Sequence, residues 1–464
     1  MSVLWLSLLY GMMCMTPLDH VASAALSGDV DPGQSTLQQP MYLDQVIQCL
    51  IVGDYSRGGP YAMEALHHYF ILEHVRRRDA DVRNWSLCGL ILRLGLRKGY
   101  HREPSKFPNI TPFEGEMRRR QWMLLYCMDV IISIQMGIPR LIKDEQCDTK
   151  CPHNLLDTDF DEDTKELPPS RSDSEITPTL SFVAKYKMMV VLAKIADMTC
   201  LPTAENEDPC SSPGVRQVET LLQTTYKQLP EGLKFTSFSG CLGASPETIG
   251  NKLFNSIMLQ KGLIILHRRH VVGERSSTNS PSSGARYMCS AACVNESVRT
   301  CIDAALKILD YQEFVYTESQ NGGGLSVLKW RLSSSPISHE FLMATSVLCS
   351  YLYRIYRNDP DVAGASQERT RAIEKALVRT YGIWQSQTDR SRDVKRAADT
   401  LGMLIGKLRG HDDADTQPSD AVDISMDYPM AESHFGVAGA MLQNSFSLYG
   451  ESMDDFESII TWGV

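Results

Sequence analysis

Five acidic side chains crowd one short stretch of this 464-residue chain and are the first candidates for chemistry: Asp157, Asp159, Asp161, Glu162 and Asp163. In helical enzymes that use magnesium, such carboxylates lie along a helix face and converge with a second cluster across a cavity. Here the run is followed by Leu167-Pro168-Pro169, which is typical of a loop, and no second cluster appears. We expect a solvated loop; a helical magnesium-dependent enzyme of secondary metabolism is the alternative.

The histidines and hydroxyl nucleophiles do not form a recognisable catalytic pattern. His267-x-x-His270 lacks the i, i+4 spacing and the glutamate of a zinc-protease helix, so a pair at the surface or an interface is expected. The sequence contains no Gly-x-Ser-x-Gly turn, no P-loop and no Gly-x-Gly-x-x-Gly motif. We therefore expect no catalytic residue and no enzyme activity.

The 13 cysteines are scattered, and none forms a Cys-x-x-Cys pair. The closest spacings, Cys147 to Cys151 and Cys289 to Cys293, have three residues between them and no second pair nearby. A structural zinc site needs four converging ligands, usually from two such pairs. We expect reduced thiols, no metal ligands and no cofactor in this chain, with zinc only if a cysteine cluster lies upstream of it.

Asp129 lies on the apolar stripe of a predicted helix, where an unpaired carboxylate would be costly to bury. A guanidinium partner is therefore expected, either from Arg118–Arg120 or from Arg140. Because no histidine or nucleophile lies at helical spacing beside it, Asp129 is interpreted as one half of a structural ion pair.

The overall charge argues against a nucleic-acid-binding surface. The net charge is −10, so DNA binding would need a local basic patch. The candidate runs are Arg76–Arg78, Arg118–Arg120 and His267–His270. Each is short and accompanies an apolar helical pattern, which predicts a solvated or salt-bridged helix face. No DNA-binding residue is expected in this chain.

The elements that position these groups are predicted to be helices. Leu87, Leu90, Ile91 and Leu94 follow the i, i+3, i+4, i+7 rule. Further apolar stripes predict three more helices. One begins at Thr177-Pro178, one contains Leu253, Ile257 and Ile264, and one spans Phe341 to Leu352. Alternating strands and regular repeats are not found. The expected fold is all-α: an irregular multi-helix domain with long polar loops and a partly disordered C-terminal tail.

The helix that carries Asp129 has clear start and stop signals. Thr111-Pro112-Phe113-Glu114 combines an N-cap threonine, a proline at the first position and a glutamate that closes a capping box. Gly137-Ile138-Pro139 ends the helix. Its predicted buried stripe consists of Trp122, Leu125, Asp129, Ile132 and Met136.

Polar connectors divide the chain. They cover residues 157–176, 200–214, 273–286 and 411–423, and the last is the clearest boundary. We expect one helical domain over 1–410, a disordered linker over 411–440 and an acidic, aromatic segment over 441–464.

Residues 3–15 are apolar, and Ala22-Ser23-Ala24 is similar to a signal-peptidase site. No lysine or arginine precedes the apolar run, and the cysteines do not form a disulfide framework. We expect a buried first helix with Leu4, Leu8 and Met12 on one face; a secreted helical protein is the alternative. No stretch reaches the roughly 20 apolar residues of a membrane span, so no membrane partner is expected.

An ordered series of motifs runs from residue 85 to residue 182. It begins with Gly95-Leu96-x-x-Gly99-Tyr100-His101-Arg102, passes through the capped helix, and continues from Cys147 to Asp157 and on to Thr177. Its signature residues are Glu114, Glu116, Arg118, Arg119, Arg120, Trp122, Asp129, Gly137, Pro139, Cys147, Asp148, Pro152 and Asn154. This order resembles the middle homology region of the fungal binuclear zinc-cluster transcription factors. The resemblance covers most of residues 1–360.

The resemblance implies a helical regulatory domain that works in the nucleus on RNA polymerase II genes, such as those of a metabolic or secondary-metabolite gene cluster. It implies the transcription machinery, a homodimer and an unidentified effector as partners, and structural roles for the signature residues. One departure stands out, because the N-terminal zinc cluster of the family is absent from these residues. Either upstream exons are missing from the gene model, or the chain is a regulator without a cluster. DNA would then be reached through a missing domain or a partner.

Overall fold

The computed structural model describes the chain over residues 2–27, 32–76, 79, 81–200, 213–241, 243–272, 291–320, 322–356, 366–388 and 391–412. Within these ranges the regular structure is helical, with no β-strand. The prediction of an all-α fold is confirmed.

The helices, in chain order, are α1 (Val3–Ser27), α2 (Pro32–Val52), α3 (Ala62–Arg76), α4 (Val82–Arg97), α5 (Pro112–Met136), α6 (Pro178–Cys200), α7 (Pro213–Lys227), α8 (Pro246–Val272), α9 (Ala291–Glu318), α10 (Lys329–Leu332), α11 (Ser335–Tyr356), α12 (Gln367–Gln385) and α13 (Arg392–Asp412). The helices that the sequence analysis predicted from apolar stripes and caps are present, as α4, α5, α6, α8 and α11. A short 3₁₀ helix, η6 (Ser326–Leu328), precedes α10.

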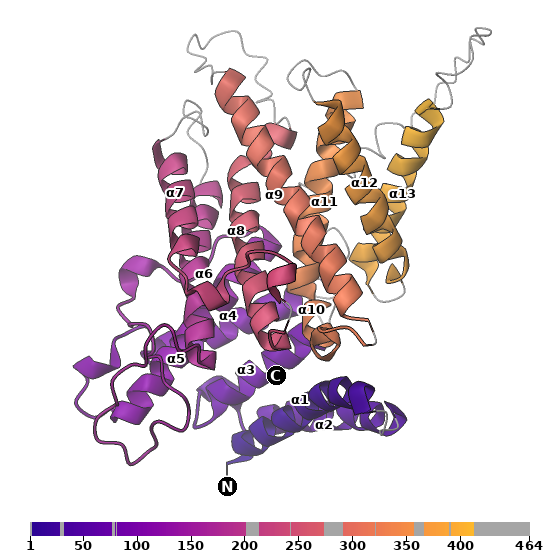
Figure 1. Ribbon diagram of the computed structural model, residues 1–464. Helices are drawn as coiled ribbons and strands as arrows, with labels where there is room; N and C mark the ends of the chain where they lie inside the picture. The colour runs from indigo at the N-terminus through magenta and orange to yellow at the C-terminus, as the bar shows by residue number, and fades with distance from the viewer. Residues whose placement is uncertain are drawn as a thin grey trace, which may run out of the picture.

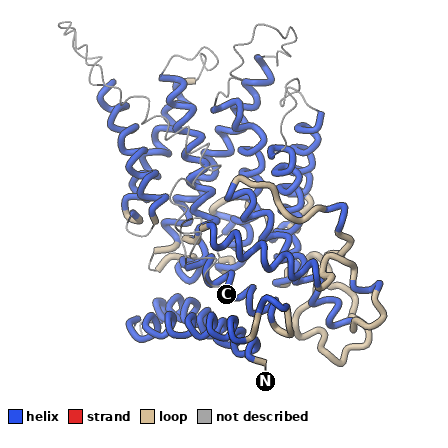
Figure 2. Tube along the Cα trace, turned by 180° about the vertical axis from the view of Figure 1, so that it is seen from behind, coloured by secondary structure: helices blue, strands red, loops and turns tan. Residues whose placement is uncertain are grey.

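Helices α7, α8, α9, α11, α12 and α13 stand side by side in a row, with α6 packed against α7 and α8 (Figure 1). The α1–α2 hairpin lies across the base of this row and contacts α3. Helices α3, α4 and α5 link the hairpin to α6. Seen from behind, the long loops gather at one corner, beside α5 (Figure 2).

Helix α5 is the central element of the candidate site. The Thr111 hydroxyl accepts a hydrogen bond from the Glu114 amide, and the Glu114 carboxylate accepts one from the Thr111 amide, so the predicted capping box is present. Gly137 ends the helix in the left-handed region, with φ 66°. Helix α4 approaches closely because Gly95 lacks a side chain: a Cβ there would lie 2.7 Å from Leu125 Cδ1.

The buried apolar side chains form one continuous cluster that extends from Leu4 in α1 to Ile405 in α13. Residues 3–15 lie in α1, as expected, with Leu4 buried and Leu8 half-buried against the cluster. The prediction that Met12 shares this buried face is wrong, because its side chain is 44% exposed. The apolar N-terminal segment therefore contributes to the core through its first turns.

The connector 157–176 is a loop, as predicted. The connectors 200–214, 273–286 and 411–423 lie mostly or wholly outside the described residues, as do the rest of the predicted linker and the 441–464 segment. The division at residue 410 stays a prediction. Among the helices that the structure describes, none combines the length and the apolar character needed to cross a bilayer.

Candidate functional site

The signature residues meet where the first turns of α5 face the loop between α5 and α6, residues 137–177. Glu116 is fully buried there. Its carboxylate accepts a hydrogen bond from the His153 amide at 2.9 Å, and its second oxygen lies 2.8 Å from His153 Nδ1. Arg119 and Arg120 approach the same carboxylate at 3.4 and 3.6 Å. Glu116 thus fixes the loop to the helix.

Arg119 joins Glu116 to a second buried carboxylate, Glu103, in the loop before α5. Glu103 also accepts hydrogen bonds from the amides of Lys150 and Ser105. Burial by itself would raise the pKa of Glu103, but the bond from Arg119 and these amides lower it to about 2. The Glu103 carboxylate is therefore ionised at neutral pH.

Two more signature residues extend this network. The Asp148 carboxylate accepts from the Glu103 amide at 2.7 Å and pairs with Lys106 at 2.6 Å, which holds the two loops together. Asn154 donates to the carbonyls of Ser172 and Glu175 and accepts from the hydroxyl of Thr177. Since Thr177 in turn accepts from the Leu180 amide in the first turn of α6, Asn154 links the loop to the start of that helix.

The remaining signature residues are spread along α5 and its flanks. Trp122 is buried, with its ring 6.1 Å from that of His101, and the Arg118 guanidinium lies 5.4 Å from the ring of Tyr100. Cys147 donates to the Lys143 carbonyl. Pro152 is buried, whereas Pro139 is exposed and joins no polar network.

The prediction of a guanidinium partner for Asp129 is wrong. The buried Asp129 carboxylate accepts hydrogen bonds from the amides of Leu141 and Ile142 at 3.1 and 2.7 Å, with Ser133 at 3.5 Å. Burial raises the pKa of Asp129, and the two amide bonds oppose that rise. Backbone donors satisfy the carboxylate, so Asp129 anchors the segment that follows α5.

Arg140, the other expected partner, binds elsewhere. It pairs with Asp197 on α6 at 2.7 Å and with Asp144 at 3.1 Å, and its guanidinium lies 5.6 Å from the ring of Tyr126. Sequence reasoning missed this link because Asp197 is far away in the chain. Together these contacts make the signature residues a clamp between α5, its flanking loops and α6.

The acidic run is a loop, and two of its carboxylates pair with arginines. Arg171 pairs with Asp159 at 2.6 Å, and Arg120 pairs with Asp157 at 2.5 Å. Across the part of the chain that the structure describes, no group of three or more histidine, cysteine, aspartate or glutamate side chains could hold a metal ion.

The predicted basic faces have mixed outcomes. Arg119 and Arg120 are salt-bridged, as expected. Of the two positions expected for the His267–His270 pair, a surface or an interface, the surface is wrong for His267, which is buried with Nε2 3.5 Å from Glu219. Residues 77 and 78 of the first run lie outside the described residues.

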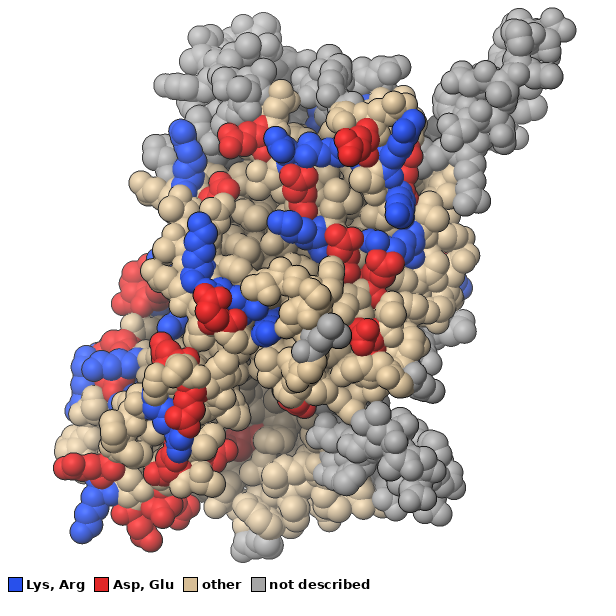
Figure 3. Space-filling model, viewed as in Figure 1, with Lys and Arg blue, Asp and Glu red and all other residues tan. Residues whose placement is uncertain are grey.

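On the face drawn in Figure 3, lysine and arginine side chains alternate with aspartate and glutamate. Arg379 on α12 pairs with Asp310 and Glu313 on α9 at 2.8 and 2.7 Å, and Arg369 pairs with Asp303 at 3.0 Å. Such pairing uses arginines that a nucleic-acid interface would need for phosphates.

A cavity of about 420 Å³ lies between α3, α5, α6, α8 and α11, and its rim includes the exposed Glu247 and Arg331. Its walls are mainly apolar and include Phe70, Leu124, Phe182, Phe254 and Ile337. Close-packed protein interiors contain few voids larger than a water molecule. This volume falls in the range of small-molecule pockets, which makes the cavity the candidate functional site.

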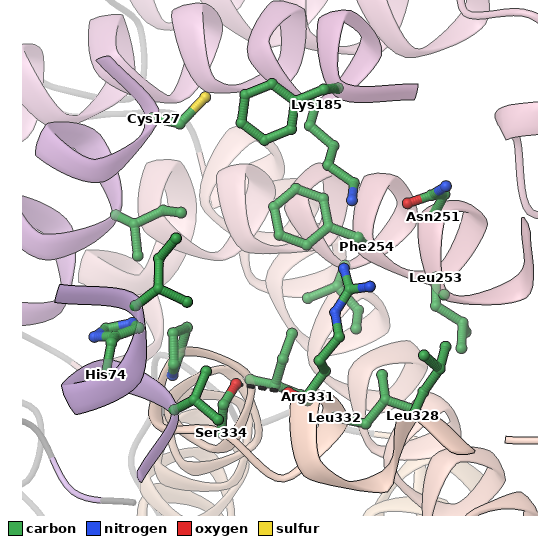
Figure 4. A pocket seen from close by; sticks show the side chains of 18 of the residues that line it. His74, Cys127, Lys185, Asn251, Leu253, Phe254, Leu328, Arg331, Leu332 and Ser334 are labelled. Atoms are coloured by element: carbon green, nitrogen blue, oxygen red, sulfur yellow. Dashed lines mark hydrogen bonds between the residues drawn. The ribbon is translucent and has the colours of Figure 1, made fainter. Parts of the chain in front are cut away.

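Polar side chains interrupt the apolar wall, among them His74 on α3, Lys185 on α6, Asn251 on α8 and Arg331 on α10. Lys185 and Arg331 point towards each other beside the ring of Phe254 (Figure 4). The Lys185 amine lies 5.2 Å from that ring. Burial, and secondarily the charge of Arg331, lowers the pKa of Lys185 to about 8, and burial lowers that of His74 to about 4.

The sequence carried one overlooked signal for this cavity. Lys185 lies three residues after Phe182 and four before Met189, on what is otherwise an apolar stripe of α6. A cation on such a stripe indicates either a buried partner or a binding site.

The part of the chain that contains the clamp matches a known protein family. A family model described as the fungal specific transcription factor domain matches residues 57–231. The chain is 36% identical to the Zn(2)-C6 fungal-type transcription factor mpsB of Macrophomina phaseolina, over 79% of this chain and 48% of the relative. Residues 57–231 of this chain are a fungal-specific transcription factor domain. The resemblance inferred from the signature residues is confirmed.

Two further relatives are also named as transcription factors. Transcription factor phm2 of Pyrenochaetopsis sp. is 32% identical over 96% of this chain and 59% of the relative. The equisetin cluster transcription factor eqxF of Fusarium heterosporum is 32% identical over 88% of this chain and 56% of the relative. The chain thus spans about half the length of the relatives it matches. No solved structure matches it.

Proposed function

We propose that this chain is the regulatory part of a transcription regulator of RNA polymerase II genes in a metabolic or secondary-metabolite cluster. The observation that carries the proposal is the family match over residues 57–231, together with relatives named as transcription factors, one of them for a gene cluster. In this proposal the chain works in the nucleus and is not an enzyme.

Charge and cysteine spacing support the assignment of DNA binding to another segment or to a partner. With a net charge of −10 and no Cys-x-x-Cys pair, residues 1–464 would reach DNA only through another segment or a partner. They would bind no zinc or other cofactor. Their partners would be the transcription machinery, a second copy of the chain, and an effector. The signature residues would act structurally, by holding α5, its loops and α6 in one arrangement.

A reporter experiment tests the regulatory role. The 464-residue chain is fused to a bacterial DNA-binding domain and expressed in a fungal cell that carries the matching operator upstream of a reporter gene. We expect expression to change relative to the DNA-binding domain alone. An unchanged reporter, with the fusion present in the nucleus at equal abundance, would contradict the proposal.

Two measurements on the purified chain test the rest. Fluorescence anisotropy with promoter DNA should show no sequence-specific binding at physiological salt, and elemental analysis should show no stoichiometric zinc. Tight, sequence-selective binding by the chain alone would overturn the assignment of DNA contacts to another segment.

A further inference from the structure

The cavity contains a basic side chain whose charge is not compensated by the protein. Lys185 contacts the Phe254 ring, and within the described residues its amine has no hydrogen bond or ion pair. Glu247, the one carboxylate among the described lining residues, is exposed. An ammonium in such an apolar wall without a partner is costly, so the position calls for an anion from outside the chain.

Another buried lysine of this protein is neutralised by a carboxylate, which is how buried lysines are usually stabilised. Lys261 on α8 is buried, and it is paired with Glu340 on α11. Lys185 is half-buried, because its side chain borders the cavity. Both lysines lie among apolar helices, yet only the one outside the cavity faces a carboxylate. Any counterion of Lys185 would therefore have to lie inside the cavity.

Arg331 strengthens this reading because its guanidinium points towards the Lys185 amine (Figure 4). The proximity of Arg331 contributes to the lowered pKa of Lys185, so the two cations repel each other when the cavity holds no anion. An acidic group between them would bind both cations through charge-assisted hydrogen bonds. The apolar remainder of such a molecule would meet Leu124, Phe182 and Ile337.

We propose that this cavity binds an apolar small molecule with one acidic group, whose anion lies between Lys185 and Arg331. The inference rests on the proposed function, in which this molecule is the effector of the regulator. Binding would connect α6 to α10, the short helix that carries Arg331, and would thereby set the packing of α10 between η6 and α11. The ligand class follows from the wall: an amphipathic weak acid rather than a sugar, a nucleotide or a neutral lipid.

Calorimetry with two matched probes tests the ligand class. Dodecanoate carries the acid, and dodecan-1-ol has the same chain length without it. We expect saturable binding of dodecanoate at pH 7, and affinity for dodecan-1-ol at least about tenfold weaker, since a charge-assisted hydrogen bond is lost. Equal affinities, or no saturable binding of dodecanoate, would overturn the proposal.

Variants locate the acid. Lys185→Met and Arg331→Met should each weaken dodecanoate binding by at least about tenfold, whereas Lys187→Met, two residues along α6 on an exposed position, should leave it unchanged. Leu332→Trp, which fills the cavity, should abolish binding of both probes. Unchanged dodecanoate affinity in Lys185→Met would refute the site.

The unfolding temperature of the free protein tests the same inference without ligand and shows whether each variant is folded. Because the unpaired ammonium destabilises the free protein, Lys185→Met should raise its unfolding temperature, whereas Lys187→Met should not. A lowered unfolding temperature in Lys185→Met would mean that the amine is compensated within the protein, which contradicts the inference.

The reporter assay separates this inference from the proposed function. If dodecanoate binds as expected but the fusion does not change reporter expression, the cavity assignment stands and the regulatory role fails. If the reporter responds to the fusion but the purified chain does not bind dodecanoate, the regulatory role stands and the ligand class is wrong.

Discussion

Arg119 is the residue on which the clamp depends most, because it lies between two buried carboxylates. Glu103 and Glu116 are separate in the sequence, and only Glu116 is part of the predicted signature. Sequence reasoning missed Glu103 because a lone glutamate in a loop carries no periodic signal. Its burial becomes visible only when the loop before α5 folds against the 137–177 loop.

Replacing Arg119 by methionine should lower the free energy of unfolding at pH 7 by about 3–5 kcal/mol, because Glu103 stays buried without its cation and Glu116 keeps only Arg120. The neighbouring Arg118→Met, which removes only the contact with the Tyr100 ring, should cost about 1 kcal/mol or less. Urea titrations of the three proteins measure the difference. Equal losses would show that Arg119 is no more important than a surface arginine.

The same pair predicts a pH dependence. The pKa of Glu103 is about 2 in the folded protein against an ordinary value of 4.5, so its stabilising effect is present above pH 4.5 and is lost as the pH falls towards 2. The difference in stability between the wild type and Arg119→Met should therefore shrink across this range. Urea titrations at a series of pH values test it, and a constant difference would contradict it.

Ligand binding at Lys185 should take up protons near pH 8. The free amine has a pKa of about 8, and a bound anion would raise it. The other titratable groups that line the cavity are Arg331, the exposed Glu247, His74 and the Cys127 thiol, and burial keeps His74 and Cys127 neutral at this pH. Calorimetry with dodecanoate in buffers of different ionisation enthalpy should show an uptake of up to about half a proton at pH 8. Lys185→Met should show none.

At the scale of elements, helix α5 depends on its two ends. The capping box at Thr111 and Glu114 sets the start, and Gly137 sets the end. Asp129 then fixes the following segment through the amides of Leu141 and Ile142, so one helix positions both the clamp and the turn that leads into the 137–177 loop.

Two glycine substitutions should therefore change stability in opposite directions. Gly137→Ala places a Cβ on a residue with φ 66° and should cost about 1 kcal/mol. Gly382→Ala, inside α12 and with no neighbouring atom within 4 Å of an added Cβ, should stabilise by about 0.5–1 kcal/mol. Thermal and urea unfolding measure both, and a stabilising Gly137→Ala would disprove the role of this helix end.

At the scale of the whole molecule, the apolar N-terminal segment belongs to the same core as the C-terminal helices. Leu4 packs so closely on Gly53 that a Cβ there would lie 2.6 Å from its side chain. The buried cluster then continues through α5, α8 and α11 to α13. A single cluster of this extent favours cooperative unfolding.

Leu4→Ala should consequently destabilise the chain by about 2–5 kcal/mol, as buried leucine truncations do. Val52→Ala, at the exposed end of the packed helix α2, should stay within about 0.5 kcal/mol of the wild type. If Leu4→Ala has no effect on urea unfolding, residues 3–15 are not part of the core and the interpretation of α1 is wrong.

The sequence by itself determined the all-α class, several of the helices and the family resemblance. Capping, glycine stops and the 3.6-residue period act over a few neighbouring residues, so Thr111–Glu114, Gly137 and Thr177-Pro178 could be read directly. The ordered signature residues were sufficient to identify the family because they hold one compact part of the fold.

Only the tertiary structure decided which distant groups each charged side chain contacts. Asp129 binds amides 12 and 13 positions further on, and Arg140 pairs with Asp197, 57 positions away. The cavity needs walls from several helices and a charge, Lys185, that is left without a carboxylate. Which distant groups share one buried volume depends on how the helices pack, and local periodicity does not encode that packing.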